Sequence, residues 1–131
     1  MKNFSLTQNE RVKKKRDFEK IYSFAKVLFS SDKMIKVHLL SIDSNVSGVK
    51  IAAAVSKKAG SAVWRNRVKR LIKESYRLNK KSLVDKVLEK KIQLLLVFAP
   101  YKLSEKNNKK IYLRDISPGV VELMNKIKQQ V

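Results

Sequence analysis

The segment from Ile92 to Ala99 is almost entirely apolar, and it constrains the fold more than any other part of the chain. Gln93 is its one polar residue, and Pro100 ends it. A strand covered on one face alternates apolar and polar side chains, whereas a strand covered on both faces reads as a continuous apolar run. The run is far shorter than the ~20 residues that cross a membrane. It therefore predicts a central strand and no membrane span.

Other segments show the alternation expected of strands with one buried face. Residues 35–39 alternate apolar side chains with Lys36 and His38. Residues 49–55 place bulky side chains on one face and mostly small ones on the other, and residues 27–29 can add a short strand. We therefore expect a sheet of about four strands.

Residues 62–80 form the clearest predicted helix, with Ser61 placed to cap its first turn. At 100° per residue, its core side chains fall on one stripe: Trp64, Val68, Leu71, Ile72 and Ser75. The opposite side is polar and basic, with Arg67 on a flank and Arg65 near the core edge. Because this helix lies between two predicted strands, the segment from 49 to 99 is typical of a βαβ unit.

Two more helices are expected near the ends of the chain. One is expected from Thr7 onward, and its apolar stripe includes Phe18 and Tyr22. Residues 1–8 are expected to be a flexible tail. The other begins at Ser117-Pro118, a good N-cap and first-turn pair; residues 104–116 could be loop or helix. The fold class is thus α/β (α+β), a two-layer sandwich with an N-terminal helix, a basic helix in a βαβ crossover and a C-terminal helix, in a single domain spanning 1–131.

The distribution of charge points to the partner. The chain holds 31 Lys and Arg against 11 Asp and Glu, a formal net charge of +20. Residues 57–81 hold ten of the basic side chains and one acidic one, and four of the seven Arg lie between positions 65 and 77. A solvated helix face is the plain alternative, but like charges this dense repel one another unless a partner neutralises them. The Arg guanidinium can bind a phosphate through two hydrogen bonds. We therefore expect a nucleic acid as the partner, in preference to an anionic membrane.

Residues for autonomous catalysis are scarce. The chain has no Cys, which excludes thiolate nucleophiles and Cys-bound zinc and fits a reducing compartment. Its one His, His38, lies in a predicted strand, where a structural role is more common than a catalytic one. The acids are scattered, and three Gly are too few for a phosphate-binding glycine loop. We expect no catalytic residue and no metal or cofactor bound by the protein alone.

One stretch of the basic segment carries a specific pattern: Val55-Ser56-Lys57-Lys58, then Gly60-Ser61-Ala62-Val63-Trp64-Arg65-Asn66-Arg67-Val68-Lys69-Arg70, then Glu74 and Arg77. This pattern resembles the signature of the bacterial ribonuclease P protein component, and the Arg-Asn-Arg triplet is its most specific part. Asp17-Phe18 and Ile21-Tyr22 resemble the first helix of that family more weakly. The order of predicted elements agrees, so the resemblance spans most of the chain.

The resemblance implies a protein subunit of ribonuclease P, which assists a catalytic RNA in cutting the 5′ leader from precursor tRNA while the RNA holds the catalytic Mg²⁺. It implies the catalytic RNA and precursor tRNA as partners. The short apolar run and the polar N-terminus lead us to expect a cytoplasmic location without a membrane, and no obligate protein partner is evident. The resemblance also implies a left-handed crossover, against the usual hand. The implied RNA-binding residues are Lys57, Lys58, Arg65, Asn66, Arg67, Lys69, Arg70, Lys73 and Arg77. The implied leader-binding groove contains Phe18, Tyr22, His38 and Ala54.

Alternatives remain at this stage. Phe18 and Tyr22 could stack on unpaired bases or simply pack the first helix onto the sheet. A structural ribosomal-type protein that binds rRNA without aiding cleavage accounts for the charge but not for the Arg-Asn-Arg triplet. An autonomous nuclease would need clustered carboxylates, which the sequence lacks.

Overall fold

The computed structural model describes residues 25–42 and 47–131, and in them four strands form one mixed sheet. The strands are β1 (Lys26–Phe29), β2 (Ile35–Ile42), β3 (Gly48–Ala53) and β4 (Gln93–Pro100), in the spatial order β1-β2-β4-β3. β2 is antiparallel to both β1 and β4, whereas β3 runs parallel to β4. All four predicted strands and the parallel crossover are confirmed. The predicted tail and N-terminal helix, with Phe18 and Tyr22, lie outside the described residues.

β4 is the central strand that its apolar run predicts. Residues 94–98 are all buried, because β2 and β3 flank the strand and neighbouring side chains pack against it on both faces. Leu94, Leu96 and Phe98 belong to the main core, while Leu95 and Val97 belong to a smaller cluster on the opposite face. The continuous apolar run is thus the sum of two alternating sets of side chains.

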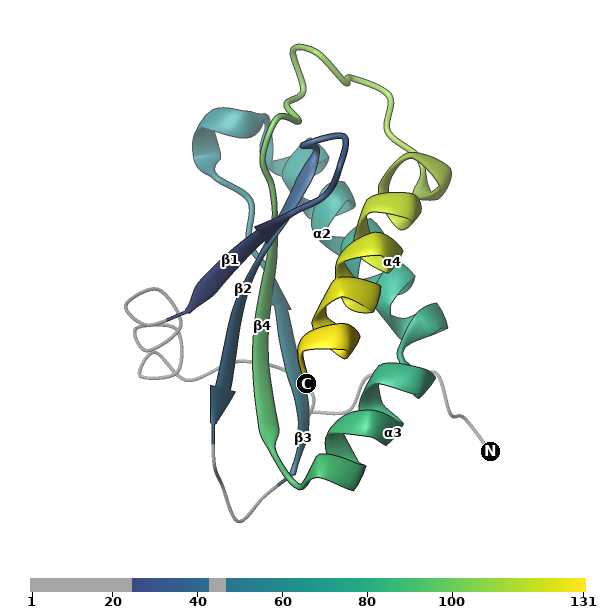
Figure 1. The fold of residues 1–131 in the computed structure, drawn as a ribbon. Helices are drawn as coiled ribbons and strands as arrows, with labels where there is room; N and C mark the ends of the chain where they lie inside the picture. Colours follow the sequence, from purple (N-terminus) through teal and green to yellow (C-terminus); the bar gives the residue numbers. More distant parts are fainter. Residues whose placement is uncertain (1–24, 43–46) are drawn as a thin grey trace.

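Three helices lie on the same face of the sheet (Figure 1), giving the predicted two-layer arrangement. They are α2 (Ala62–Asn79), α3 (Lys81–Lys90) and α4 (Leu113–Gln130), and the short 3₁₀ helix η2 (Lys57–Ala59) precedes α2. The structure adds α3, which the sequence interpretation did not include. It buries Leu83 and Val87, four residues apart, against the main core.

α2 follows its predicted bounds and its predicted core stripe. Trp64, Val68, Ile72 and Ser75 are buried, and Leu71 packs against them from the edge of the core. Tyr76 is a further buried side chain on this face. The Ser61 hydroxyl accepts a hydrogen bond from the Trp64 backbone N–H at 3.3 Å, as the predicted cap requires. The polar side of α2 therefore faces away from the sheet.

The predicted start of the last helix at Ser117-Pro118 is wrong. α4 begins a turn earlier, at Leu113, and Pro118 lies inside it. A proline there removes one backbone hydrogen bond, but the earlier turn is held by other contacts. Asp115 accepts a hydrogen bond from the Tyr112 N–H at 2.9 Å, and Ile116 is fully buried. Burial of Ile116 and the Asp115 cap together outweigh the loss at Pro118.

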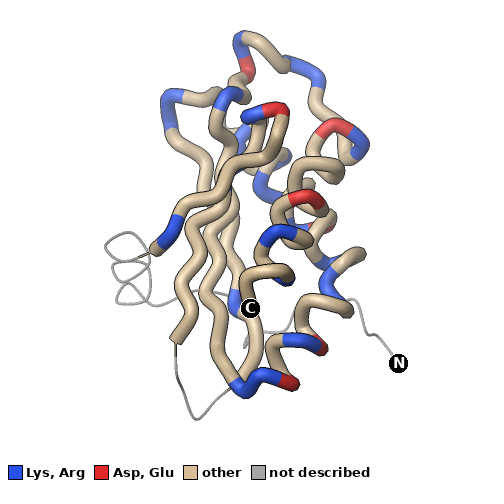
Figure 2. The backbone as a smooth tube through the Cα atoms, viewed as in Figure 1, with Lys and Arg blue, Asp and Glu red and all other residues tan. Residues whose placement is uncertain are grey.

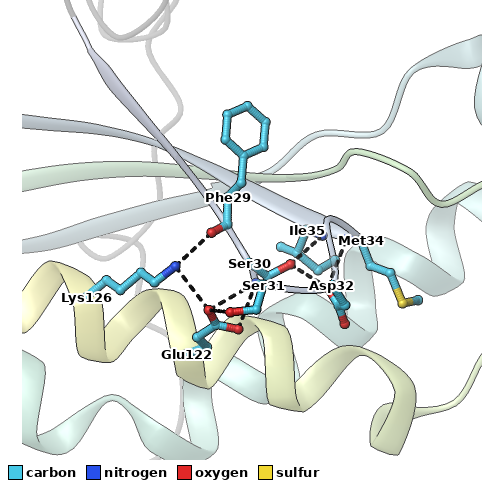
Figure 3. A network of polar contacts seen from close by, with 8 residues as sticks. All are labelled: Phe29, Ser30, Ser31, Asp32, Met34, Ile35, Glu122 and Lys126. Carbon is cyan, nitrogen blue, oxygen red and sulfur yellow. Dashed lines mark hydrogen bonds and ion pairs between the residues drawn. The ribbon is translucent and has the colours of Figure 1, made fainter.

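A polar network ties the β1–β2 hairpin to α4 (Figure 3). Both Glu122 carboxylate oxygens accept the Ser31 backbone N–H at 3.0 Å, and the Ser31 hydroxyl also donates to Glu122. Lys126 contacts Glu122 at 3.0 Å and donates to the Phe29 carbonyl at 3.0 Å. These bonds lower the pKa of Glu122 to about 2, mainly through the Ser31 hydroxyl and N–H. α4 is thereby fixed along the first two strands.

Within the described residues, no helix combines the length and apolar character needed to cross a bilayer.

Candidate nucleic-acid interface

The outer side of α2 carries the basic side chains that the sequence predicts. We call the set Asn66, Lys69, Arg70, Lys73 and Arg77 the basic face of α2. Asn66 and Arg70 are exposed, and the other three are partly exposed. Lys57 and Lys58, on η2 just before the helix, are also exposed, so the structure brings most of the predicted RNA-binding residues to α2 and its N-terminal end.

Arg65 and Arg67 are partly buried and each is anchored to the backbone. Arg65 donates through Nε to the Gly60 carbonyl at 3.0 Å, and Arg67 donates through Nε to the Ile111 carbonyl at 2.7 Å. A guanidinium has five N–H donors, so one bond to Nε orients the group and leaves its terminal nitrogens for another acceptor. These two Arg are therefore preorganised in a way that a Lys could not be.

Arg77 of the basic face has an acidic partner, Glu74. It donates from Nε to Glu74 at 2.9 Å and forms an ion pair with the same carboxylate. The hydrogen bond from Arg77 lowers the pKa of Glu74, and the reciprocal bond raises the pKa of Arg77. Glu74 therefore offsets part of the charge that Arg77 brings to this face.

The segment between β4 and α4, residues 101–112, adds cations that the sequence interpretation did not assign to the interface. The Trp64 indole N–H donates to the Asn108 carbonyl at 2.9 Å, and Arg67 holds Ile111 as described, so this segment lies against the start of α2. Its exposed lysines are Lys102, Lys106, Lys109 and Lys110. Figure 2 shows Lys and Arg on this segment as well as on the helices. The lysines of this segment are visible in the sequence. The position of the segment beside α2 could not be predicted from the sequence.

Gly60 explains how closely this segment approaches α2. A Cβ at Gly60 would lie 2.8 Å from both the Glu105 Cβ and the Trp64 ring. Glu105 also accepts the Ser61 N–H at 2.7 Å. Glycine is needed here for space rather than for its backbone conformation, and it lets η2, α2 and the 101–112 segment meet.

A second candidate surface lies on the sheet face away from the helices. Val97 of β4 is paired with His38 of β2 on one side and with Ala52 of β3 on the other. Ala54 lies two residues after Ala52. Ala52 and Ala54 pack with Val97 on this face. The structure thus brings His38 and Ala54 to one face, with β4 between them; the other two predicted groove residues, Phe18 and Tyr22, are not described.

His38 is partly buried on this face, and its surroundings favour the neutral imidazole. Burial lowers the pKa of His38, and the positive charge of Lys36, two residues away on the same strand, lowers it further. A hydrogen bond with the Val97 backbone opposes this shift. At neutral pH, His38 therefore presents a neutral ring.

An aromatic cluster at the end of the same face was missed by sequence reasoning. The Phe29 and Tyr101 rings lie 4.7 Å apart, with Lys33 5.5 Å from the Phe29 ring centroid and Lys36 5.8 Å from that of Tyr101. The alternation of β2 predicts the side on which Lys36 lies. Nothing in the sequence places Tyr101, which follows β4, next to Phe29 of β1.

In the part of the chain that the structure describes, no three His, Asp or Glu side chains come together as a metal site. The described surfaces offer cations that can hold phosphate, and aromatic and small side chains on one face of the sheet.

Comparison with known proteins identifies the family of the chain. The model of the Ribonuclease P family matches residues 6–117. Ribonuclease P protein components are 37% identical over 81 residues in Clostridium novyi (strain NT), covering 62% of this chain and 70% of that protein, and 31% identical over 119 residues in Clostridium botulinum (strain Loch Maree / Type A3), covering 91% and 95%.

Solved structures share the fold. The ribonuclease P protein from Thermotoga maritima superposes with a TM-score of 0.66 at 23% identity, covering 92% of this chain and 96% of that one. The protein from Staphylococcus aureus gives a TM-score of 0.61 at 23% identity, covering 90% and 94%. At this identity the likeness establishes the architecture, and the curated relatives carry the family assignment.

Proposed function

The chain belongs to the family of ribonuclease P protein components, subunits that assist leader removal from precursor tRNA, and on this premise we propose which surface binds which partner. The basic face of α2, with Arg65, Arg67, Lys57 and Lys58, binds the catalytic RNA. The sheet face away from the three described helices, with His38 and Ala54, binds the 5′ leader of precursor tRNA, and Phe18 and Tyr22 also contact the leader.

The observation that carries the first assignment is the polar side of α2. It presents preorganised guanidinium groups beside exposed lysines, and one carboxylate, Glu74, lies among them. Phosphates of a structured RNA are the ligand class that such a surface binds best. A ribosomal-type rRNA-binding protein is not favoured, because the chain belongs to a family with another function.

The second assignment rests on the small side chains of β3 and the uncharged ring of His38, with the cation Lys36 and the Phe29–Tyr101 aromatic pair on the same face. Ala52 and Ala54 are small side chains packed against Leu95 and Val97, and the lowered pKa of His38 favours an uncharged ring beside them at neutral pH. A single strand can lie over such a face and stack its bases on rings. In this proposal the RNA and its Mg²⁺ supply the cleavage chemistry, while the protein supplies binding and orientation of the substrate.

Reconstitution tests the function as a whole. The protein is combined with a ribonuclease P RNA at a Mg²⁺ concentration too low for the RNA alone to cleave efficiently, and cleavage of precursor tRNA is measured. We expect cleavage to increase when the protein is added. If addition of protein gives no gain over RNA alone, the proposed function is wrong. If the purified protein cleaves without RNA, the division of roles is wrong.

A further inference from the structure

A cationic hollow lies where the start of α4 meets the side of α2. It has a volume of about 240 Å³ and is lined by Arg67, Lys109, Lys110, Ile111 and Tyr112. Tyr112 is 42% exposed although it is a large aromatic side chain. The Arg67 guanidinium lies 5.7 Å from the Tyr112 ring centroid and that of Arg114 lies 4.7 Å from it. We call this set of residues, with Arg114, the Tyr112 hollow.

The hollow is held rigidly by the backbone around it. The Ile111 carbonyl accepts the Arg67 Nε–H at 2.7 Å, and the next residue, Tyr112, is fixed at the beginning of α4. Its N–H donates to Asp115 at 2.9 Å, and its carbonyl accepts the Asp115 N–H at 2.9 Å. The Tyr112 ring therefore has a fixed base against which the two guanidinium groups lie, an arrangement stabilised by cation–π attraction.

The charge of the hollow is not balanced within the protein. Arg67, Lys109, Lys110 and Arg114 bring four positive charges close together, and among the described residues none of them forms an ion pair with a carboxylate. Asp115 is the nearest acid in sequence, and one of its oxygens already accepts the Tyr112 N–H. Such a concentration of cations is unfavourable in the free protein and favourable once an anion enters.

We propose that the Tyr112 hollow is a phosphate-binding site for the RNA subunit, so that the RNA interface extends from the basic face of α2 onto the 101–112 segment and the start of α4. Arg67, which lies on α2 beside the basic face and is bonded to Ile111, joins the two parts. Lys109, Lys110 and the terminal N–H groups of Arg67 and Arg114 contact backbone phosphates. Tyr112 is a positioning residue, since its ring orients the two guanidinium groups. The inference rests on the proposed function and adds to it residues outside α2.

The first test removes the two lysines. The double variant Lys109→Gln/Lys110→Gln is compared with the control Lys81→Gln/Lys90→Gln. The control removes the same amount of charge from two exposed lysines of α3, which do not line the hollow. Binding of the Clostridium botulinum ribonuclease P RNA is measured at several salt concentrations. We expect ~10-fold weaker binding for the first pair and a slope of log K against log salt reduced by roughly 1.4–1.8, because each phosphate contact releases counterions. We expect little change in slope for the control pair.

The second test separates positioning from general stability. Tyr112→Phe keeps the ring and should bind the RNA like the wild type. Tyr112→Leu removes the ring and should bind several-fold more weakly, with an unchanged melting temperature. The Phe variant is the matched control, since a merely structural loss in the Leu variant would appear in melting. If the Tyr112→Leu variant does not fold, the RNA affinity of the Lys109→Gln/Lys110→Gln variant alone tests the proposal.

Two outcomes overturn the inference while leaving the proposed function intact. In one, the Lys109/Lys110 pair binds the RNA no more weakly than the α3 control pair. In the other, its defect appears only when precursor tRNA is compared with mature tRNA, which places the leader rather than the RNA subunit at the hollow. If instead the wild-type protein fails to bind ribonuclease P RNA, the proposed function itself is wrong.

Discussion

Arg67 and Arg70 lie three residues apart on α2 yet differ in their contacts. Arg70 is exposed, whereas Arg67 is partly buried and bonded to the Ile111 carbonyl. The sequence predicts both as RNA-binding residues from the Arg-Asn-Arg pattern and the helical wheel. It does not predict the anchoring of Arg67, because its acceptor lies 44 residues away.

This difference predicts two kinds of defect. Arg70→Ala should weaken binding of ribonuclease P RNA and leave the free energy of unfolding unchanged. Arg67→Ala should weaken RNA binding and also destabilise the protein by about 1 kcal/mol, since it leaves the Ile111 carbonyl without this donor. RNA affinity and urea unfolding of each variant check this. Equal stability losses for the two variants would contradict the anchoring role of Arg67.

His38 gives a prediction about pH. Its folded-state pKa is lowered by burial and by Lys36, so below its usual pKa of 6.5 the unfolded chain binds more protons than the folded one. The contribution of the neutral ring to stability is therefore complete above about pH 6.5 and decreases as pH falls through the lowered folded-state pKa. His38→Gln removes this dependence.

The measurement is the free energy of unfolding of the wild type and the Gln variant between pH 5 and 7.5. The difference between the two proteins should change in favour of the variant as pH falls. A difference that stays constant across this range would show that His38 does not titrate in an environment that disfavours its charge.

At the scale of elements, the sequence predicts those whose burial pattern is strong. The apolar run of β4 and the stripe of α2 each identify their element, because one periodicity dominates the segment. The start of α4 was misplaced because Pro118 is a strong local signal, whereas the burial of Ile116 is a tertiary effect. Residues 81–90 were not assigned to a helix, although Leu83 and Val87 are spaced for one face.

The contact between α4 and the β1–β2 hairpin yields a prediction at this scale. Glu122→Gln keeps the shape of the side chain but weakens the bonds to Ser31 and Lys126. We expect the free energy of unfolding to fall by about 1 kcal/mol at neutral pH. The loss is smaller than for a fully buried ion pair, because solvent screens this partly exposed carboxylate. Because the pKa of Glu122 is lowered from 4.5 to about 2, its stabilisation is complete above about pH 4.5 and is lost as pH falls toward 2.

Unfolding of the wild type and the Gln variant across this acid range provides the check. Their difference in free energy of unfolding should shrink as pH decreases. Lys81→Gln, which removes an exposed i, i+4 ion pair with Asp85 on α3, is a control with little expected effect at any pH. If the Glu122 and Lys81 variants behaved alike, the network of Figure 3 would not hold α4 to the hairpin.

At the scale of the whole molecule, the two proposed surfaces lie on opposite layers. The described helices cover one face of the sheet (Figure 1). The strand register and packing place His38 and Ala54 on the other face. The net charge of +20 predicts an anionic partner, but it cannot divide that charge between surfaces. That division depends on which side of α2 is buried, and the periodicity of the sequence predicts this side. It also depends on the packing of residues 101–112 against α2, which the sequence does not predict.

Separate surfaces predict separable and additive defects. Arg70→Ala should weaken assembly with the RNA, and the assembled particle should then bind precursor and mature tRNA in the same proportion as the wild type. Tyr22→Ala should weaken precursor binding and leave mature tRNA binding unchanged. Loss of one stacked base corresponds to ~1–3 kcal/mol, or roughly 5- to 150-fold in affinity.

The double variant is the sharpest test, because effects at sites that share no partner add within about 0.5 kcal/mol. Affinities of the RNA for each protein, and of each particle for precursor and mature tRNA, are measured for the wild type, both single variants and the double variant. We expect the RNA defect of the double variant to equal that of Arg70→Ala and its precursor defect to equal that of Tyr22→Ala. The same mixed defect in both single variants would mean that one continuous surface contacts both RNAs, and the assignment of the two layers to two partners would be wrong.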